Sequence, residues 1–221
     1  MRELLRNFLK WTRMLSLFRR SRRWLRDRSL LVERVFFVPK TPTGGPVLLN
    51  LGCGEHSGPG FINVDVRRLP NIHHVHDIRQ LPMFASETVD LVYACHVTEH
   101  FPRHELLAVL KEWCRVLRPG GTLRISVPDF DALLQVYEAS GGRADSIVNQ
   151  LMGQEPPYDC HYSIWNERDT RELFTDLGLK NFRHWDPEIA PYHGFQDKSQ
   201  RKMRVAGQEL LISLNVEADK A

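Results

Sequence analysis

Short apolar segments recur through residues 47–127, and they constrain the fold more than any other feature of the sequence. Runs this short and this apolar are typical of parallel strands that are buried on both faces. An amphipathic helix is expected between the fourth and fifth segments, beginning near Pro102 and ending before Pro119. The pattern predicts an α/β domain with a largely parallel sheet, whose first five strands are Val47–Leu51, Phe61–Asp65, Ile72–His76, Val89–Ala94 and Thr122–Val127.

The remaining elements follow from capping signals. Asp131 is expected to N-cap a helix that runs to Glu138, and Asn166 a second helix that ends at Gly178. Residues 141–165 are interpreted as an insertion between the fifth strand and this second helix. The two final strands are predicted at Phe182–Trp185 and Leu210–Val216.

Prolines and glycines between residues 39 and 46 predict a linker, which divides the chain into an extension at 1–45 and a domain at 46–221. Residues 1–40 carry twelve basic and three acidic side chains, a net charge of +9, whereas the whole chain carries only +3. Leucine, phenylalanine and tryptophan at helical spacing among these arginines predict a basic amphipathic helix over residues 1–36. Such a helix can lie on an anionic membrane surface, or it can cap the domain with its arginines in water.

Other partners and locations are less favoured by the composition. No apolar run approaches the length of about 18 residues that a membrane-spanning helix needs. Nucleic acid is not expected as a partner, because no RNA-binding motif accompanies the arginines. The four cysteines show no CxxC pairing, which favours a reduced, cytoplasmic protein, with peripheral contact at the inner face of the membrane if the basic helix binds there.

Glycines and acids follow the first three predicted strands. Gly52-Cys53-Gly54 directly follows the first, and glycines at the end of a central parallel strand let a ligand approach the backbone. Asp65 ends the second strand, where a carboxylate can accept hydrogen bonds from a ribose diol. Asp77-Ile78 follows the third strand and offers an acceptor and an apolar contact to an adenine ring. Each could be only a turn or loop residue, but together they predict a nucleotide-like ligand.

These motifs, in this order, resemble class I S-adenosylmethionine-dependent methyltransferases over residues 47–128. The segments that carry the resemblance are Leu49–Gly54, Asn63–Asp65, Asp77–Pro82, Val89–His96 and Val116–Gly121. Within that family the chain looks most like small methyltransferases that are often linked to polysaccharide biosynthesis. The resemblance implies a Rossmann-like seven-stranded sheet in the order 3-2-1-4-5-7-6, with the last strand antiparallel and helices on both faces.

The resemblance also implies a cofactor, S-adenosyl-L-methionine, and a site for each of its parts. Asp65 would hold the ribose, and Asp77 and Ile78 would bracket the adenine. His96 and Val97 would face the cofactor near its sulfonium. The methionine part would lie over Leu51, Gly52, Cys53 and Gly54.

One departure from the family pattern lies between Gly54 and Phe61. Only six residues separate them, too few for the helix that normally connects the first two parallel strands. Either this helix is reduced to a turn, or the second strand lies elsewhere.

The catalytic candidates are His100, Asp129 and His161, any of which could orient an acceptor hydroxyl or remove its proton. Asp129 could instead cap a helix, and His161 could pack against Trp165. The sequence His96-Val-Thr-Glu-His100 matches a zinc-binding HxxEH pattern. That pattern needs a long regular helix, so no metal is expected.

The expected activity is O-methylation of a sugar or glycan intermediate by S-adenosylmethionine. A small metabolite or tRNA as acceptor, and a non-catalytic cofactor-binding subunit, stay open as alternatives. An NAD-dependent oxidoreductase is disfavoured, because Ser57 occupies the place of the third glycine and Asp65 follows the glycines too closely.

Overall fold

The computed structural model describes residues 42–154 and 159–221, so the predicted basic helix at 1–36 and its membrane contact lie outside the described residues.

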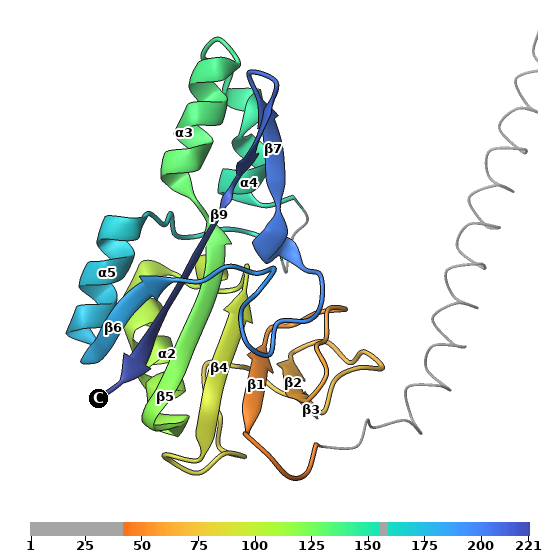
Figure 1. Ribbon diagram of the computed structural model, residues 1–221, viewed down its shortest axis with the longest axis vertical. Coiled ribbons are helices and arrows are strands. Elements are labelled where there is room, and N and C mark those ends of the chain that lie inside the picture. The colour runs from red at the N-terminus through yellow and green to blue at the C-terminus, as the bar shows by residue number, and fades with distance from the viewer. Residues whose placement is uncertain (1–41, 155–158) are drawn as a thin grey trace, which may run out of the picture. The chain divides into compact units, whose positions relative to one another are not determined.

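The described chain is built on one seven-stranded sheet (Figure 1), in the order β3-β2-β1-β4-β5-β9-β6. The first five strands are parallel, and β9 runs antiparallel to both β5 and β6. This confirms the predicted order, with β9 as the seventh strand. The strands are β1 Leu48–Leu51, β2 Phe61–Asp65, β3 His74–Val75, β4 Val89–Cys95, β5 Leu117–Pro128, β6 Leu179–His184 and β9 Ser213–Lys220.

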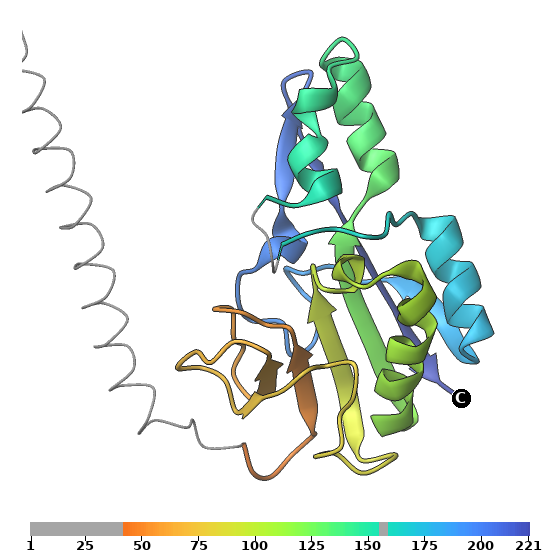
Figure 2. The ribbon, with the colours of Figure 1, turned by 180° about the vertical axis from the view of Figure 1, so that it is seen from behind.

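Two helices, α2 Arg103–Val116 and α5 Glu167–Asp176, cover one face of the sheet, as the view from behind in Figure 2 shows. Each turns an apolar stripe toward the strands, because its large apolar residues recur at helical spacing. Trp113 of α2 and Phe174 of α5 are almost completely buried in the main core. Asn166 caps α5 and Gly178 follows it at positive φ, as predicted.

The opposite face is covered differently. In Figure 1 the segment between β6 and η3 Lys198–Gln200 crosses in front of β4 and β1. Tyr93 of β4 contacts Trp185, His193 and Phe195 of this segment edge to face. A loop therefore lies where a second helical layer was expected, and it brings residues 186–200 to the sheet.

The connection between β1 and β2 is a turn. Leu48 pairs with Phe61 and Leu51 with Val64 in a parallel register, so the second strand lies where the sequence predicted it. The missing helix leaves the carboxyl end of β1 open above Gly52.

The carboxyl-terminal half departs from the predicted elements. The predicted strand Leu210–Val216 is divided at Ile212 between β8 Gln208–Leu211 and β9, because the amide of Ile212 bonds Arg201 and its carbonyl accepts from Asp129. β8 pairs with β7 Lys202–Val205 in a hairpin that was not predicted. The hairpin packs beside α3 Phe130–Ala139, beyond the carboxyl ends of the central strands in Figure 1.

The insertion at 141–165 contains η2 Ala144–Ser146 and α4 Val148–Met152. Its later part is held over η1 Thr98–His100, because the amides of Tyr162 and Ser163 donate to the carbonyl of Glu99.

Within the residues that the structure describes, no helix is long and apolar enough to span a membrane.

Asp129, not Asp131, is the N-cap of α3. Its carboxylate accepts hydrogen bonds from the amides of Asp131 and Ala132, so the prediction of the cap was wrong by two residues. We expect Asp129→Ala to lower the free energy of unfolding by about 1 kcal/mol, because these amides lose their acceptor. Asp131→Ala is the matched control and should cost much less in the same urea titration. Equal losses in the two variants would contradict the capping role.

Candidate functional site

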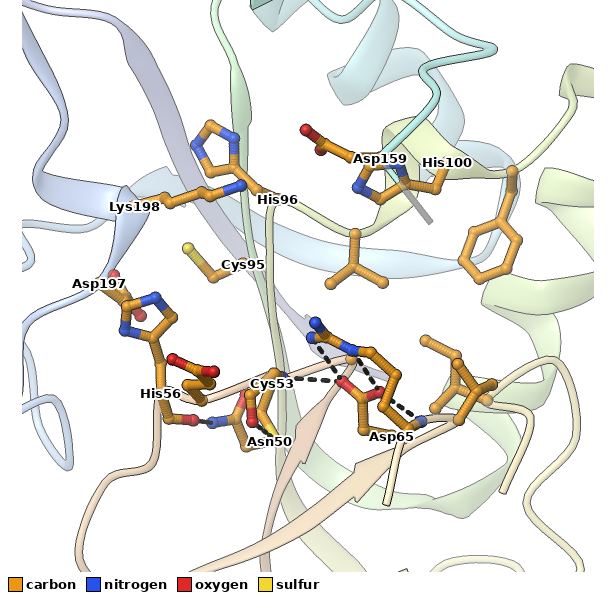
Figure 3. A pocket seen from close by; sticks show the side chains of 18 of the residues that line it. Asn50, Cys53, His56, Asp65, Cys95, His96, His100, Asp159, Asp197 and Lys198 are labelled. Atoms are coloured by element: carbon orange, nitrogen blue, oxygen red, sulfur yellow. Dashed lines mark hydrogen bonds and ion pairs between the residues drawn. The ribbon is translucent and has the colours of Figure 1, made fainter. Parts of the chain in front are cut away.

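A cavity of about 480 Å³ opens at the carboxyl ends of β1, β2 and β4 (Figure 3). Parallel sheets bind their ligands at this edge. Leu51 does not line it, because its side chain is fully buried in the core. All the other predicted cofactor residues do line the cavity: Gly52, Cys53, Gly54, Asp65, Asp77, Ile78, His96 and Val97.

Asp65 is almost completely buried at the floor of this cavity, where Figure 3 shows its hydrogen bonds as dashed lines. One carboxylate oxygen accepts from the amide of Gly54 at 2.8 Å, and the other from the amide of Arg67 at 2.8 Å. The Arg67 guanidinium lies 3.3 Å from the same carboxylate. The acid at the end of β2 therefore fixes the glycine turn after β1 and presents a charged acceptor to the cavity.

Gly52 is required by close packing as well as by its backbone. Its φ is +63°, and a Cβ there would lie 2.7 Å from a methyl group of Val97. The contact joins the turn after β1 to the turn after β4, so a larger side chain at 52 would displace Val97 into the cavity.

Cys53 lies buried between the two glycines. Burial, and to a lesser degree the charge of Asp65, raise the pKa of its thiol to about 12. We expect iodoacetamide to label Cys53 far more slowly in the folded protein at pH 8 than in urea, because the thiolate is the nucleophile. Peptide mass spectrometry measures this, and equal labelling rates would contradict the burial.

The same pKa shift has a consequence for stability. The unfolded thiol ionises near the ordinary value of 9.0, whereas the folded thiol stays protonated up to about 12. Cys53 therefore favours the unfolded state increasingly as the pH rises through this window. The free energy of unfolding should fall from pH 8 to pH 10, and less so in Cys53→Ala.

Asp77 and Ile78 also line the cavity, after β3. The Asp77 carboxylate is exposed and pairs with Arg79 at 3.1 Å, and Arg79 also pairs with Glu105 at 2.8 Å. Ile78 is buried, and its carbonyl accepts a hydrogen bond from Trp113 at 2.8 Å. An apolar wall beside an exposed carboxylate suits a flat ring with an amino group.

His96 sits at the sharp turn after β4, where its φ is +52°. The hydroxyl of Ser213 donates to the carbonyl of Lys198, so His96 Nε2 is the donor in its 2.9 Å contact with Ser213. His96 Nδ1 lies 3.3 Å from a carboxylate oxygen of Glu99. His96 thus links the sheet to η1.

Glu99, His100 and His161 form a cluster at the edge of this cavity. The rings of His100 and His161 meet edge to face with centroids 4.9 Å apart, and His161 Nε2 lies 4.0 Å from Glu99. Burial acts to raise the pKa of Glu99, but the contact and charge of His96 and the nearby histidines outweigh it, so the pKa is lowered. Burial lowers the pKa of His161.

A second cavity, of about 690 Å³, adjoins the first. His100 lines the first cavity and His161 the second, so two of the predicted catalytic residues meet where the cavities adjoin. Five residues line both cavities: His56, His96, Asp159, Asp197 and Lys198.

Asp129, the third catalytic candidate, is not brought to this cluster. It caps α3 and lines a separate hollow with His184 and Trp185. Asp159, Asp197 and Lys198 were missed, because the loop around Asp159 and the start of η3 carry no recognisable sequence motif. Figure 3 labels Asp159, Asp197 and Lys198 among the residues that line the first cavity with His96 and His100.

A family model described as a methyltransferase domain matches residues 49–125. The matched part holds the glycine turn, Asp65, Asp77, Ile78, His96 and His100. No curated protein matches the chain.

Solved structures share the fold at low sequence identity. A SAM-dependent methyltransferase from Archaeoglobus fulgidus is 14% identical with a TM-score of 0.50, covering 90% of this chain and 94% of that one. A possible exported protein from Bordetella parapertussis is 16% identical with a TM-score of 0.50, over 89% and 68% of the two chains. The CurJ carbon methyltransferase is 16% identical with a TM-score of 0.50, over 83% of this chain but only 50% of its own.

Proposed function

We propose that this S-adenosylmethionine-dependent methyltransferase, which carries a methyltransferase domain on a methyltransferase fold, methylates a hydroxyl group of a sugar or glycan intermediate. The observation that carries the proposal is the junction of the two cavities at His100 and His161. One cavity is lined by the residues expected to bind the cofactor. The other is open to an acceptor.

The cofactor cavity fits S-adenosylmethionine part by part. Asp65 supplies a buried carboxylate for the ribose hydroxyls, and Gly52 exposes backbone to the methionine part. Ile78 and Asp77 offer an apolar wall and an acceptor to the adenine. His96 and Val97 complete the wall at the methyl end. When bound, the cofactor supplies an electrophilic methyl group on a positively charged sulfur.

The second cavity has the lining of a site for a hydroxyl-rich ligand. Amide side chains that both donate and accept hydrogen bonds surround it, as expected for binding a sugar rather than an apolar ring. The residues of this kind are Asn149, Gln150, Gln154, Gln196 and Gln200.

His100 and His161 are the groups that we propose act on the acceptor hydroxyl. Nδ1 of His161 lies 3.0 Å from the carbonyl of Gln150, and Nδ1 of His100 lies 2.9 Å from the carbonyl of Cys160. A carbonyl can only accept, so each Nδ1 carries a proton and each Nε2 is the ring atom left to face the acceptor. In its neutral form, an imidazole held in this way can receive a hydroxyl proton as the methyl group is transferred.

The experiment is methyl transfer from labelled S-adenosylmethionine to a panel of nucleotide sugars, oligosaccharides, small aromatic hydroxyl compounds and tRNA. We expect label on a carbohydrate hydroxyl, with His161→Ala losing turnover while it still binds S-adenosylhomocysteine. Label only on an aromatic compound or on tRNA would overturn the acceptor class. Tight cofactor binding with no transfer to any acceptor would favour a non-catalytic subunit.

We also propose that residues 1–36 hold the enzyme at an anionic membrane surface, where a lipid-linked acceptor would reside. The support is the net charge of +9 over residues 1–40, interleaved with apolar side chains. Full-length protein should sediment with vesicles that contain anionic lipid, and much less with neutral vesicles. Unchanged binding after deletion of residues 1–36 would contradict this proposal.

A further inference from the structure

We infer that Glu99, His100 and His161 form a binding site for a divalent transition-metal ion. One ligand atom from each residue lies within 4.8 Å of the others. Glu99 and His100 come from η1, and His161 comes from the insertion, so the cluster forms only when the chain folds. It differs from the HxxEH reading of the sequence, because His96 Nε2 is bonded to Ser213 and its Nδ1 faces Glu99, whereas His161 joins the cluster from the insertion.

The first argument is the state of the Glu99 carboxylate. Glu99 is 0% exposed, and neither of its oxygens has an aligned hydrogen-bond donor among the described residues. His96 Nδ1, at 3.3 Å, is close enough for an ion pair but not aligned for a hydrogen bond. His96 and His161 both face Oε1, and no ion pair among the described residues reaches Oε2, so the buried carboxylate is only partly compensated, which is costly. A metal ion bound to Glu99 would compensate it directly.

The second argument is the orientation of the two imidazoles. Histidines that ligate a metal almost always donate the proton of the other ring nitrogen to a carbonyl or a carboxylate. His161 and His100 both place Nδ1 against a backbone carbonyl, which leaves Nε2 as the ligand atom. His161 Nε2 already faces Glu99 at 4.0 Å and Asp159 at 3.8 Å.

The kinds of ligand atom in the cluster indicate which metal ions it would bind. Two imidazoles and one carboxylate suit Zn²⁺, Co²⁺ or Fe²⁺, whereas Mg²⁺ and Ca²⁺ prefer ligands that are all oxygen. Around a tetrahedral Zn²⁺, neighbouring ligand atoms lie about 3.4 Å apart. The widest spacing in the cluster, up to 4.8 Å, therefore has to close by as much as about 1.4 Å when a metal ion binds.

If the proposed methyl transfer to a hydroxyl group holds, on which this step rests, the metal ion would activate that hydroxyl. Three protein ligands leave a coordination position open, as in catalytic zinc sites. An acceptor hydroxyl in that position would have a lowered pKa and could lose its proton to Asp159. Its oxygen would then bond to the methyl carbon while the bond from that carbon to sulfur breaks and its electron pair stays on sulfur. In this arrangement the metal ion activates the hydroxyl group, and the imidazoles act as metal ligands rather than as bases.

The test is metal binding by the untagged full-length protein, stripped with a chelator and examined without cofactor or acceptor. Cobalt is followed by visible absorption and zinc by calorimetry. We expect one saturable equivalent, weakened at least tenfold in His161→Ala and in Glu99→Gln. His104→Ala is the matched control, because His104 is exposed and outside the cluster, and it should bind like the wild type.

Two outcomes would overturn the inference: no saturable binding by the wild type, or unchanged affinity in both cluster variants. Binding of S-adenosylhomocysteine verifies that each variant folds. Should neither variant fold, protection of His100 and His161 from diethyl pyrocarbonate by zinc decides the question in the wild type. Cofactor binding without metal binding would overturn the metal site alone, and metal binding without transfer to carbohydrate would overturn the acceptor alone.

Discussion

Replacing Asp65 with alanine is expected to weaken binding of S-adenosylhomocysteine at least tenfold, a loss of about 1.4 kcal/mol or more. The side chain is buried at the end of β2, and hydrogen bonds to a charged group are worth about 1.5–3 kcal/mol each. The variant loses the carboxylate that we propose accepts from the ribose hydroxyls. It also releases the amide of Gly54, which Asp65 holds in the turn after β1.

Calorimetric titration measures this effect, with Asp145→Ala as the control for loss of an acidic side chain. Asp145 is exposed, pairs with Arg143 and does not line either cavity, so its removal should leave binding unchanged. A thermal melt of each variant separates loss of the ribose contact from loss of the fold. Wild-type affinity in a folded Asp65→Ala protein would contradict the cofactor assignment.

The parts of the fold that depend on local burial were predictable from the sequence. Strands β1, β2 and β4 are short apolar runs, and each lies within about one residue of its predicted bounds. The positions of the glycine turn and of Asp65 were predictable for the same reason, because they stand at the ends of β1 and β2. Their roles toward a ligand stay predictions.

The cluster of His100 and His161, where we propose the acceptor binds, was not predictable in the same way. His161 meets His100 only because amides of the insertion bond the carbonyl of Glu99, and no spacing in the sequence records a contact between residues sixty positions apart. The loop that carries Asp197 and Lys198 reaches the site because Phe195 and His193 pack on Tyr93. Such contacts depend on the tertiary fold, and periodicity does not predict them.

Asp129 is a residue whose position the sequence predicted but whose role it left undecided. Its place after a central strand is equally consistent with a catalytic acid and with a helix cap, because both need a short carboxylate at the carboxyl edge of the sheet. The structure places two amides against it, and the cap accounts for the residue.

Replacing Trp113 with alanine is expected to lower the free energy of unfolding by about 3–5 kcal/mol, a large part of the 5–15 kcal/mol of a typical domain. Trp113 is 0% exposed and fills the space between α2 and the sheet, against Phe101. Urea unfolding measures the loss. Leu107→Ala is the control, because Leu107 lies on the exposed face of the same helix and should cost less than about 1 kcal/mol.

The variant Trp113→Phe tests whether the packing of Trp113 and its hydrogen bond to Ile78 have separate effects. Phenylalanine keeps most of the apolar volume but removes the indole N–H that donates to the carbonyl of Ile78. We expect a smaller loss of stability than in Trp113→Ala, together with weaker binding of S-adenosylhomocysteine, because Ile78, which we propose contacts the adenine, loses the bond that holds it to α2. Unchanged cofactor affinity in Trp113→Phe would mean that Ile78 is held in place by its own burial, and that the core and the adenine site are independent.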